Sequence, residues 1–155
     1  MKRCPDYYLG RWFSILHRLS MRHITADLKQ FGIGSGQIMF LLELYYSDGV
    51  RQEDLSTLLN IDRANTTRAV TKLEEEGYAV RKLDEEDGRA YRIYLTPKAQ
   101  AVKGELFALL GDWEDKLMAA LTTAEQEVFI ELLKKVGQSV CEHDRCALCD
   151  LEKLS

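Results

Sequence analysis

Residues 63 to 72 combine the kinds of side chain that proteins use to bind DNA. This segment holds three cations and no carboxylate, and four of its other side chains can hydrogen-bond to bases or phosphates. The residues concerned are Arg63, Asn65, Thr66, Thr67, Arg68, Thr71 and Lys72. Cationic groups position a protein on phosphates, while amide and hydroxyl groups can read base edges in the major groove. We therefore predict that this segment contacts double-stranded DNA; the alternative is an ordinary solvated surface helix.

A second group of charged residues, between residues 81 and 92, could contact the same DNA. A turn predicted at residues 87 to 89 would let the Asp87 carboxylate pair with Arg89 and hold its guanidinium in one orientation. An arginine held in this way can enter a narrow minor groove, where the negative potential is strongest. Phosphate contacts are expected from Arg81, Lys82 and Arg92. The alternative is that Asp87 and Arg89 only stabilise an exposed turn.

A third group, at the end of the chain, could bind a metal or respond to oxidation. Cys146 and Cys149 have the spacing of a metal knuckle. Cys141 or His143 could supply a third ligand, and interlocked terminal helices could bring Cys4 close. Zinc or an iron–sulfur cluster would suit such a thiolate-rich site. The alternatives are a thiol–disulfide switch that shifts the terminal helices and a tail with incidental thiols; no other motif requires a cofactor.

The helices that must position these residues follow from the apolar periodicity of the sequence. They are predicted over residues 7–29, 37–46, 51–59, 63–76, 97–121 and from about 123 to 140. Asp62 is a credible N-cap for the helix that carries the basic segment, and Gly77 stands where glycine is favoured after a helix C-terminus. The short connection between residues 59 and 63 predicts a helix-turn-helix.

After Gly77 the apolar pattern becomes typical of strands. Residues 78–83 and 89–95 flank an acidic turn at residues 84–88, which predicts a β-hairpin. Thr96-Pro97 then offers an N-cap and a proline at the first position of the next helix. A hairpin directly after a helix-turn-helix is a wing. The predicted fold class is mainly α with a small β-hairpin wing: a winged helix-turn-helix flanked by N- and C-terminal dimerisation helices.

Apolar stripes on the first helix and on the last two predict a homodimer. These helices carry more apolar surface than a winged motif of about fifty residues could cover, so they need a partner. The candidate contact residues are Trp12, Phe13, Leu16, Trp113, Leu117, Phe129 and Leu133. The alternative is a helical bundle within one chain.

These motifs, in this order, resemble the signature of the multiple antibiotic resistance regulator (MarR) family. The matching stretches are residues 55–59 and 62–77, Val80-Arg81, Asp87-Gly88-Arg89 and Leu95-Thr96, and the likeness extends over roughly residues 7–140. The resemblance implies a homodimer that binds a pseudo-palindromic operator, most often as a repressor, and is released by an effector. It also implies one domain over residues 1–155, with dimerisation helices at 1–34 and 97–140, the winged helix-turn-helix at 35–96 and a cysteine-rich tail at 141–155.

The resemblance also bears on small-molecule effectors. In this family, phenolic or lipophilic molecules bind between the dimerisation helices and the winged domain, which would place Trp12, His17, Tyr45 and Tyr46 near a pocket. Aromatic residues at helical spacing are more often core than ligand site, so no small-molecule site is assigned.

Length and composition set the broad class of the protein. The chain has 155 residues, 46% of them hydrophobic, which is enough for one sizeable core. No run approaches the roughly 18 apolar residues of a membrane span, and the N-terminus lacks the apolar segment of a signal peptide. We therefore expect a cytoplasmic location and no membrane partner. In that compartment the four cysteines are expected to be reduced thiols or metal ligands.

Two other classes of function compete with DNA recognition. A net charge of −4 at pH 7 argues at first against nucleic acid, but binding depends on the charge of the surface that meets the duplex. An enzyme could use a winged motif as a scaffold; however, no nucleophile elbow or HExxH motif is present, and no triad can be assigned by spacing. A protein-interaction module would have little need of a basic face with Arg63, Arg68 and Lys72. The prediction is a regulator that is not an enzyme.

Overall fold

Six α-helices and three short strands make up residues 5–140, the part of the chain that the computed structural model describes. The helices are α1 (Leu9–Leu28), α2 (Ser35–Tyr46), α3 (Gln52–Leu58), α4 (Arg63–Glu75), α5 (Pro97–Met118) and α6 (Thr123–Val140). The strands are β1 (Val50–Arg51), β2 (Ala79–Leu83) and β3 (Tyr91–Leu95), and short 3-10 turns occupy Pro5–Tyr7 and Lys29–Phe31. Every predicted helix is present, with ends that differ by a few residues.

The ends of α4 and the start of α5 are set by the residues that the sequence indicated. The Asp62 carboxylate accepts the backbone N–H of Asn65 at 2.9 Å and so caps α4. After α4, Gly77 adopts a φ of +75°, which favours glycine and turns the chain into β2. Thr96 caps α5 by accepting the backbone N–H of Ala99 at 3.3 Å. The basic segment is therefore a helix with both ends fixed.

The wing is a three-stranded antiparallel sheet in the order β1-β3-β2. The predicted hairpin corresponds to β2 and β3, which pair from Ala79↔Leu95 to Leu83↔Tyr91. The sequence did not reveal β1, because two residues are too few for an alternating pattern. Its pairs, Val50↔Ile93 and Arg51↔Arg92, attach the start of α3 to the base of the wing. The helix-turn-helix and the wing consequently form one unit.

The hydrophobic core lies in this winged part of the chain. Its most buried side chains come from α1, α2, α3, α4, β3 and α5: Leu28, Leu41, Leu44, Leu55, Val70, Leu73, Ile93 and Leu106. The buried Tyr78 side chain, after α4, donates its hydroxyl to the carbonyl of Phe31, after α1, at 2.6 Å and so links these two segments. On α4, Ala69 is also buried, whereas Ala64 is exposed.

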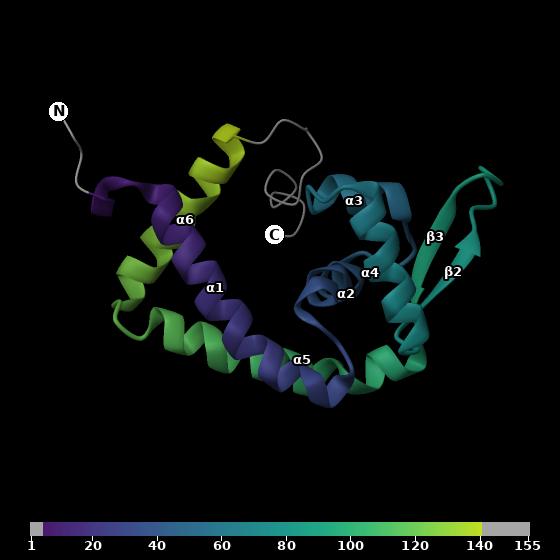
Figure 1. The fold of residues 1–155 in the computed structure, drawn as a ribbon, viewed down its shortest axis with the longest axis horizontal. Coiled ribbons are helices and arrows are strands. Elements are labelled where there is room, and N and C mark those ends of the chain that lie inside the picture. The colour runs from purple at the N-terminus through teal and green to yellow at the C-terminus, as the bar shows by residue number, and fades with distance from the viewer. Residues whose placement is uncertain (1–4, 141–155) are drawn as a thin grey trace.

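The molecule has the shape of an open arch (Figure 1). The long helix α5 spans its base, with α1 packed along it, and the wing stands at the end opposite to α6. Within the chain, Trp113 of α5 stacks on His23 of α1, with 4.4 Å between ring centroids, and its indole N–H donates to Ser20 at 3.1 Å. Among residues 5–140, no helix is both long and apolar enough to cross a membrane. This arrangement is the winged helix-turn-helix with flanking helices that the sequence predicted.

Candidate DNA-binding surface

The outward face of α4 carries most of the predicted DNA contacts. Arg63, Asn65, Thr67 and Arg68 are exposed, whereas Thr71 and Lys72 are partly covered. The Arg63 side chain is 80% exposed at the N-terminal end of the helix. This end of α4 also has the positive end of the helix dipole, which favours the approach of phosphate. The α4 face therefore has the shape and charge of a recognition helix.

Thr66 is a correction to the predicted set, because it is completely buried. Its hydroxyl donates to the Asp62 carbonyl at 3.0 Å and accepts from the Ser56 hydroxyl at 2.9 Å. Helical periodicity places position 66 on the same face as the buried Val70 and Leu73. Thr66 thus fastens α4 to α3 and faces away from the DNA-binding surface.

The exposed polar side chains of α4 hold one another in place. Arg68 donates to the Asn65 amide oxygen at 2.7 Å, and Asn65 is itself bonded to Asp62. Gln52, at the start of α3, donates to the Thr67 hydroxyl at 3.0 Å. Side chains that are already ordered lose less conformational entropy when they bind a partner. The surface is therefore partly preorganised for contact.

Lys72, at the far end of α4, is held by two carboxylates. Its ammonium lies 2.8 Å from Glu76 and 3.5 Å from Glu75. The hydrogen bond and charge of Glu76 raise the pKa of Lys72 above its ordinary value. Its contribution to the positive potential of the surface is consequently offset by its own helix.

Arg81 has internal partners and does not present the free guanidinium that the sequence suggested. It forms an ion pair with Glu74, and only 22% of its side chain is exposed. Its remaining nitrogens donate to the Gln52 amide oxygen at 3.0 Å and to the Thr71 hydroxyl at 3.0 Å. With these partners, Arg81 links β2 to α3 and α4, the two helices of the helix-turn-helix. The predicted phosphate contact by Arg81 is replaced by this structural role.

Arg92 is likewise turned inward, toward a buried carboxylate. Its Nε lies 2.9 Å from Asp84, and it donates to the Gly49 carbonyl at 3.0 Å. The Asp84 side chain is only 1% exposed and also forms an ion pair with Arg51 at 2.6 Å. Hydrogen bonds from the backbone N–H of Glu86 and from Arg51 lower the pKa of Asp84 to about 2. Arg92 is thus paired internally, but 34% of its side chain is exposed, and its phosphate contact stays a prediction.

The tip of the wing differs from its predicted arrangement. The Asp87 carboxylate accepts the backbone N–H of Arg89 at 3.1 Å, and no described ion pair joins it to the Arg89 guanidinium. This geometry corresponds to the alternative in which Asp87 stabilises the turn. The Arg89 side chain is exposed at the tip and remains available to a partner.

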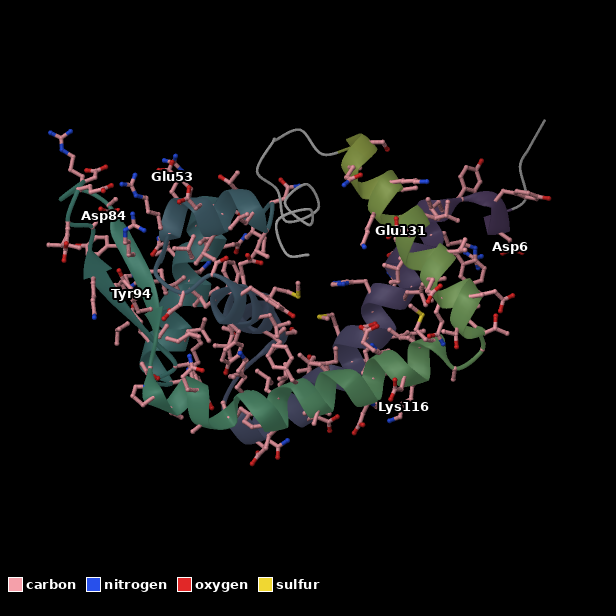
Figure 2. All side chains as sticks on the ribbon, turned by 180° about the vertical axis from the view of Figure 1, so that it is seen from behind. Asp6, Glu53, Asp84, Tyr94, Lys116 and Glu131 are labelled. Carbon is pink, nitrogen blue, oxygen red and sulfur yellow. The ribbon has the colours of Figure 1, made fainter. Side chains whose placement is uncertain are left out.

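Four of the predicted residues, Arg63 and Thr67 from α4 and Asp87 and Arg89 from the wing, meet around a hollow of about 390 Å³. Its lining comes from α3, α4 and the wing and comprises Arg51, Gln52, Glu53, Ser56, Arg63, Thr67, Asp87, Arg89, Ala90 and Tyr91. Figure 2 shows Glu53 and Asp84 at this end of the molecule, away from Asp6 and Glu131. Sequence reasoning missed Arg51, Gln52 and Asp84, whose roles depend on contacts between different elements.

The other predicted groups are distributed elsewhere. Tyr45 packs edge-on against Phe107 and donates its hydroxyl to the Ala99 carbonyl at 2.6 Å; burial raises its pKa to about 12. Tyr46 also contacts Phe107 edge-on, and His17 is exposed on α1. The thiol group, Cys4, Cys141, His143, Cys146 and Cys149, lies outside the described residues. Its zinc, iron–sulfur or redox role therefore stays a prediction, and residues 5–140 contain no cluster of potential metal ligands.

The chain is similar to known proteins in both sequence and structure. Residues 31–90 match the model of the MarR family. The crystal structure of a MarR transcriptional regulator from Methanosarcina mazei Go1 is 34% identical, with a TM-score of 0.82 over 84% of this chain and 94% of that one. The HTH-type transcriptional regulator BilQ of Clostridium symbiosum (strain WAL-14163) is 27% identical over 118 residues, which are 76% of this chain and 82% of BilQ.

A regulator from Listeria monocytogenes, crystallised with a 26mer DNA, shares the fold with a TM-score of 0.82 at 22% identity, over 99% of this chain and 96% of its own. The fold and the exposed basic helix thus define a winged helix-turn-helix DNA-binding protein. The chain belongs to the MarR family of transcriptional regulators. The relatives named here are regulators of transcription and not enzymes.

Proposed function

We propose that this protein is a homodimeric repressor that reads a pseudo-palindromic operator and is released from it by an effector. The observation that carries the proposal is the state of α6. This helix of 18 residues has no buried side chain in the single chain, although much of it is apolar. An apolar helix left uncovered in this way needs a partner surface.

The exposed residues of α6 indicate how wide that partner surface must be. Val128, Phe129, Leu132, Val136 and Val140 are between 38% and 72% exposed. At 3.6 residues per turn these positions cover about a third of the helix circumference, and Ile130 and Leu133 widen the apolar sector further. One face of a neighbouring helix could not cover such a sector alone. A helix inserted between elements of two subunits would bury it.

The first half of α1 offers a matching surface at the same end of the arch (Figure 1). The exposed apolar side chains there are Tyr8, directly before the helix, and Leu9, Trp12, Phe13, Leu16 and Leu19 within it, each at least 38% exposed. A second copy of the chain would cover these residues and α6 together through a two-fold interface. Such a dimer would carry two α4 helices, and a spacing of about 34 Å would let them enter successive major grooves on one face of the duplex.

Repression and release are the finer parts of the proposal. A dimer bound across a pseudo-palindrome blocks transcription where the operator overlaps a promoter, and an effector that changes the spacing of the two α4 helices would release it. The sequence suggests two effector chemistries: a small molecule, or a metal or oxidant acting on Cys141, Cys146 and Cys149. Metal analysis of protein purified without oxygen, and operator binding by the triple serine variant in reducing and oxidising buffer, would separate the second chemistry from the first.

The decisive experiment selects genomic DNA fragments with the purified protein and then measures the stoichiometry on the selected operator. We expect two chains per operator and two half-sites with centres about 10 base pairs apart. The double variant Phe129→Glu, Leu132→Glu should sediment as a monomer and lose operator binding. Its control is Glu127→Lys, an exposed position on the side of α6 opposite to the apolar sector. One chain per operator, or a wild-type monomer at micromolar concentration, would refute the dimer; unchanged transcription of the neighbouring gene after deletion would refute repression.

A further inference from the structure

We propose that Arg51 binds a phosphate of the DNA backbone and that Asp84 is the residue that positions it for this contact. Arg51 forms, with Arg63 and Arg89, a notch between the recognition helix and the wing. This inference rests on the DNA-binding function and adds to it a contact site that the basic segment of α4 does not contain. The notch is the hollow of about 390 Å³ described above.

The position of Arg51 is the first part of the argument. It lies in β1, directly before α3, and its pairing with Arg92 of β3 ties it to the base of the wing. About one third of its side chain is exposed, which leaves the guanidinium accessible from the notch. Arg63 reaches the notch from the start of α4, and Arg89 reaches it from the wing tip. Three elements therefore bring one cation each to a single hollow.

Asp84 fixes which edge of Arg51 is available. One Asp84 oxygen, Oδ2, accepts the Nε–H of Arg51 at 2.6 Å and forms an ion pair with the Nε of Arg92 at 2.9 Å. The other oxygen accepts the backbone N–H of Glu86 at 2.9 Å and of Asp87 at 3.4 Å. Because the Nε edge of Arg51 is occupied, its two terminal nitrogens form the edge that is left. Two N–H groups on one edge match the oxygens of a phosphate.

The charge balance of the notch favours an anion. Its lining includes two carboxylates, Glu53 and Asp87, against three arginines. Glu53 pairs with Arg63, and both side chains are more than half exposed. Glu86, whose side chain is 85% exposed, lies 3.9 Å from the Arg51 terminal nitrogen Nη2. Exposed pairs of this kind contribute little stability, so a phosphate with two charge-assisted hydrogen bonds can replace them.

The location of the notch favours a phosphate of DNA over a free anion. On one side lies the α4 face that is suited to the major groove, and on the other lies the wing tip. The backbone strand that separates a major groove from the adjacent minor groove would pass between these two elements. A phosphate at this point would fix the register of both elements on the duplex. A free phosphate ion would use the same three arginines and is distinguished by the experiment.

The test uses the full-length protein and its selected operator, and it measures affinity as a function of salt. Arg51→Ala should weaken binding about tenfold and reduce the slope of log K against log salt by about 1 for each subunit engaged. Lys116→Ala is the control, because it removes an exposed cation from α5, far from the wing (Figure 2). A slope equal to that of the wild type would overturn the inference, whereas a wild-type protein that binds no DNA would overturn the function itself.

Operators with single neutral methylphosphonates identify the phosphate concerned. A methylphosphonate at one position in each half-site should lower the operator affinity of the wild type and should lower that of Arg51→Ala little further. If no methylphosphonate position behaves in this way, the notch is not a DNA contact. The same conclusion follows if inorganic phosphate raises the Tm of the wild type but not that of Arg51→Ala, while the two proteins have equal salt slopes for DNA binding.

Asp84→Asn tests the positioning role. It should abolish the sensitivity to the same methylphosphonate, and Asp84→Glu, which keeps the charge, should restore part of it. If Asp84→Asn does not fold, Asp84→Glu alone decides, since a longer side chain displaces Arg51 and should reduce that sensitivity. Full sensitivity in a folded Asp84 variant would show that Arg51 needs no positioning residue.

Discussion

The two ends of the arch differ in how much of their apolar surface the chain covers by itself. At the winged end, Leu41, Leu44, Leu55 and Val70 are fully buried. At the other end, α6 has no buried side chain, and its Val140 is 72% exposed. The winged end therefore buries its own apolar core, while the α6 end leaves its apolar side chains exposed in the single chain, as the proposed dimer requires.

The helix α1 shows the same difference within a single element. Near its C-terminus, Ile24 and Leu28 belong to the core, but Leu9 and Trp12 near its N-terminus are 51% and 44% exposed. One helix thus joins the winged unit to the uncovered end of the arch. In the proposed dimer, a change in the packing of that end would reach the winged unit through α1 and could alter the spacing of the two recognition helices.

The largest effect is expected from removing a core side chain at the winged end. Leu44→Ala should lower the free energy of unfolding by about 2–5 kcal/mol, because it leaves a cavity in a closed core. Denaturant titration at several protein concentrations measures this loss. The matched variant is Leu132→Ala on α6, whose effect should depend on protein concentration because it acts through the dimer. Equal, concentration-independent losses in both variants would abolish the contrast between the two ends.

An intermediate effect is expected on the recognition surface. Arg68→Ala should weaken operator binding by roughly 1–3 kcal/mol, because its guanidinium is exposed on α4 and already oriented by Asn65. Arg89→Ala at the wing tip should have an effect of similar size. Filter binding at one fixed salt concentration gives the affinity, and sedimentation checks that the dimer is intact. If both variants bind the operator with wild-type affinity, α4 and the wing tip are not part of the DNA-binding surface.

Much of the winged end could be predicted from the sequence, because its elements carry local signals. The recognition helix is indicated by the acid-free basic run at residues 63–72, with Asp62 as N-cap before the helix and Gly77 after its end. Alternating apolar residues around an acidic turn indicate the hairpin. The assignment of Thr66 failed because a threonine hydroxyl is polar yet can be satisfied internally, here by Ser56. The composition of a helix does not by itself say which of its polar residues faces inward.

The partners of the arginines could not be predicted, since they come from elements distant in sequence. Arg81 meets Glu74 and Gln52 only after β2 has folded against α3 and α4. The turn at residues 84–88 has four carboxylates, and nothing in their order indicates that Asp84 alone becomes buried. The three-dimensional structure therefore replaces the predicted phosphate contact of Arg81 with an internal ion pair, gives Arg92 a partner in Asp84, and adds Arg51 as a candidate.

A smaller effect should follow from releasing Arg63 at the winged end. Glu53→Gln removes the carboxylate that pairs with Arg63 and that would also repel a phosphate in the notch. Because the pair is exposed, its loss should cost little stability, and operator affinity should rise about two- to fivefold. Glu114→Gln, which removes an exposed charge from α5, serves as the control. An unchanged or weaker affinity for Glu53→Gln would place Arg63 outside the contact surface.

The last effect is one on stability and its pH dependence, and it concerns the buried charge that the winged end contains. The pKa of Asp84 is about 2 in the folded protein, below its ordinary value of 3.8, chiefly because its carboxylate accepts the backbone N–H of Glu86 and is paired with Arg51. Since the folded-state pKa is lowered, the ionised group stabilises the fold above about pH 4, and this stabilisation is lost as the pH falls from about 4 to 2. Asp84→Asn should therefore have a lower Tm than the wild type at pH 6, and the gap should narrow steadily over that acidic range. Asp112→Asn, on the exposed side of α5, controls for the general effect of removing a carboxylate. A gap that stays constant down to pH 2 would mean that Asp84 stabilises the wing through its hydrogen-bond geometry and not through its charge, and the difference between the two ends of the arch would then be one of packing alone.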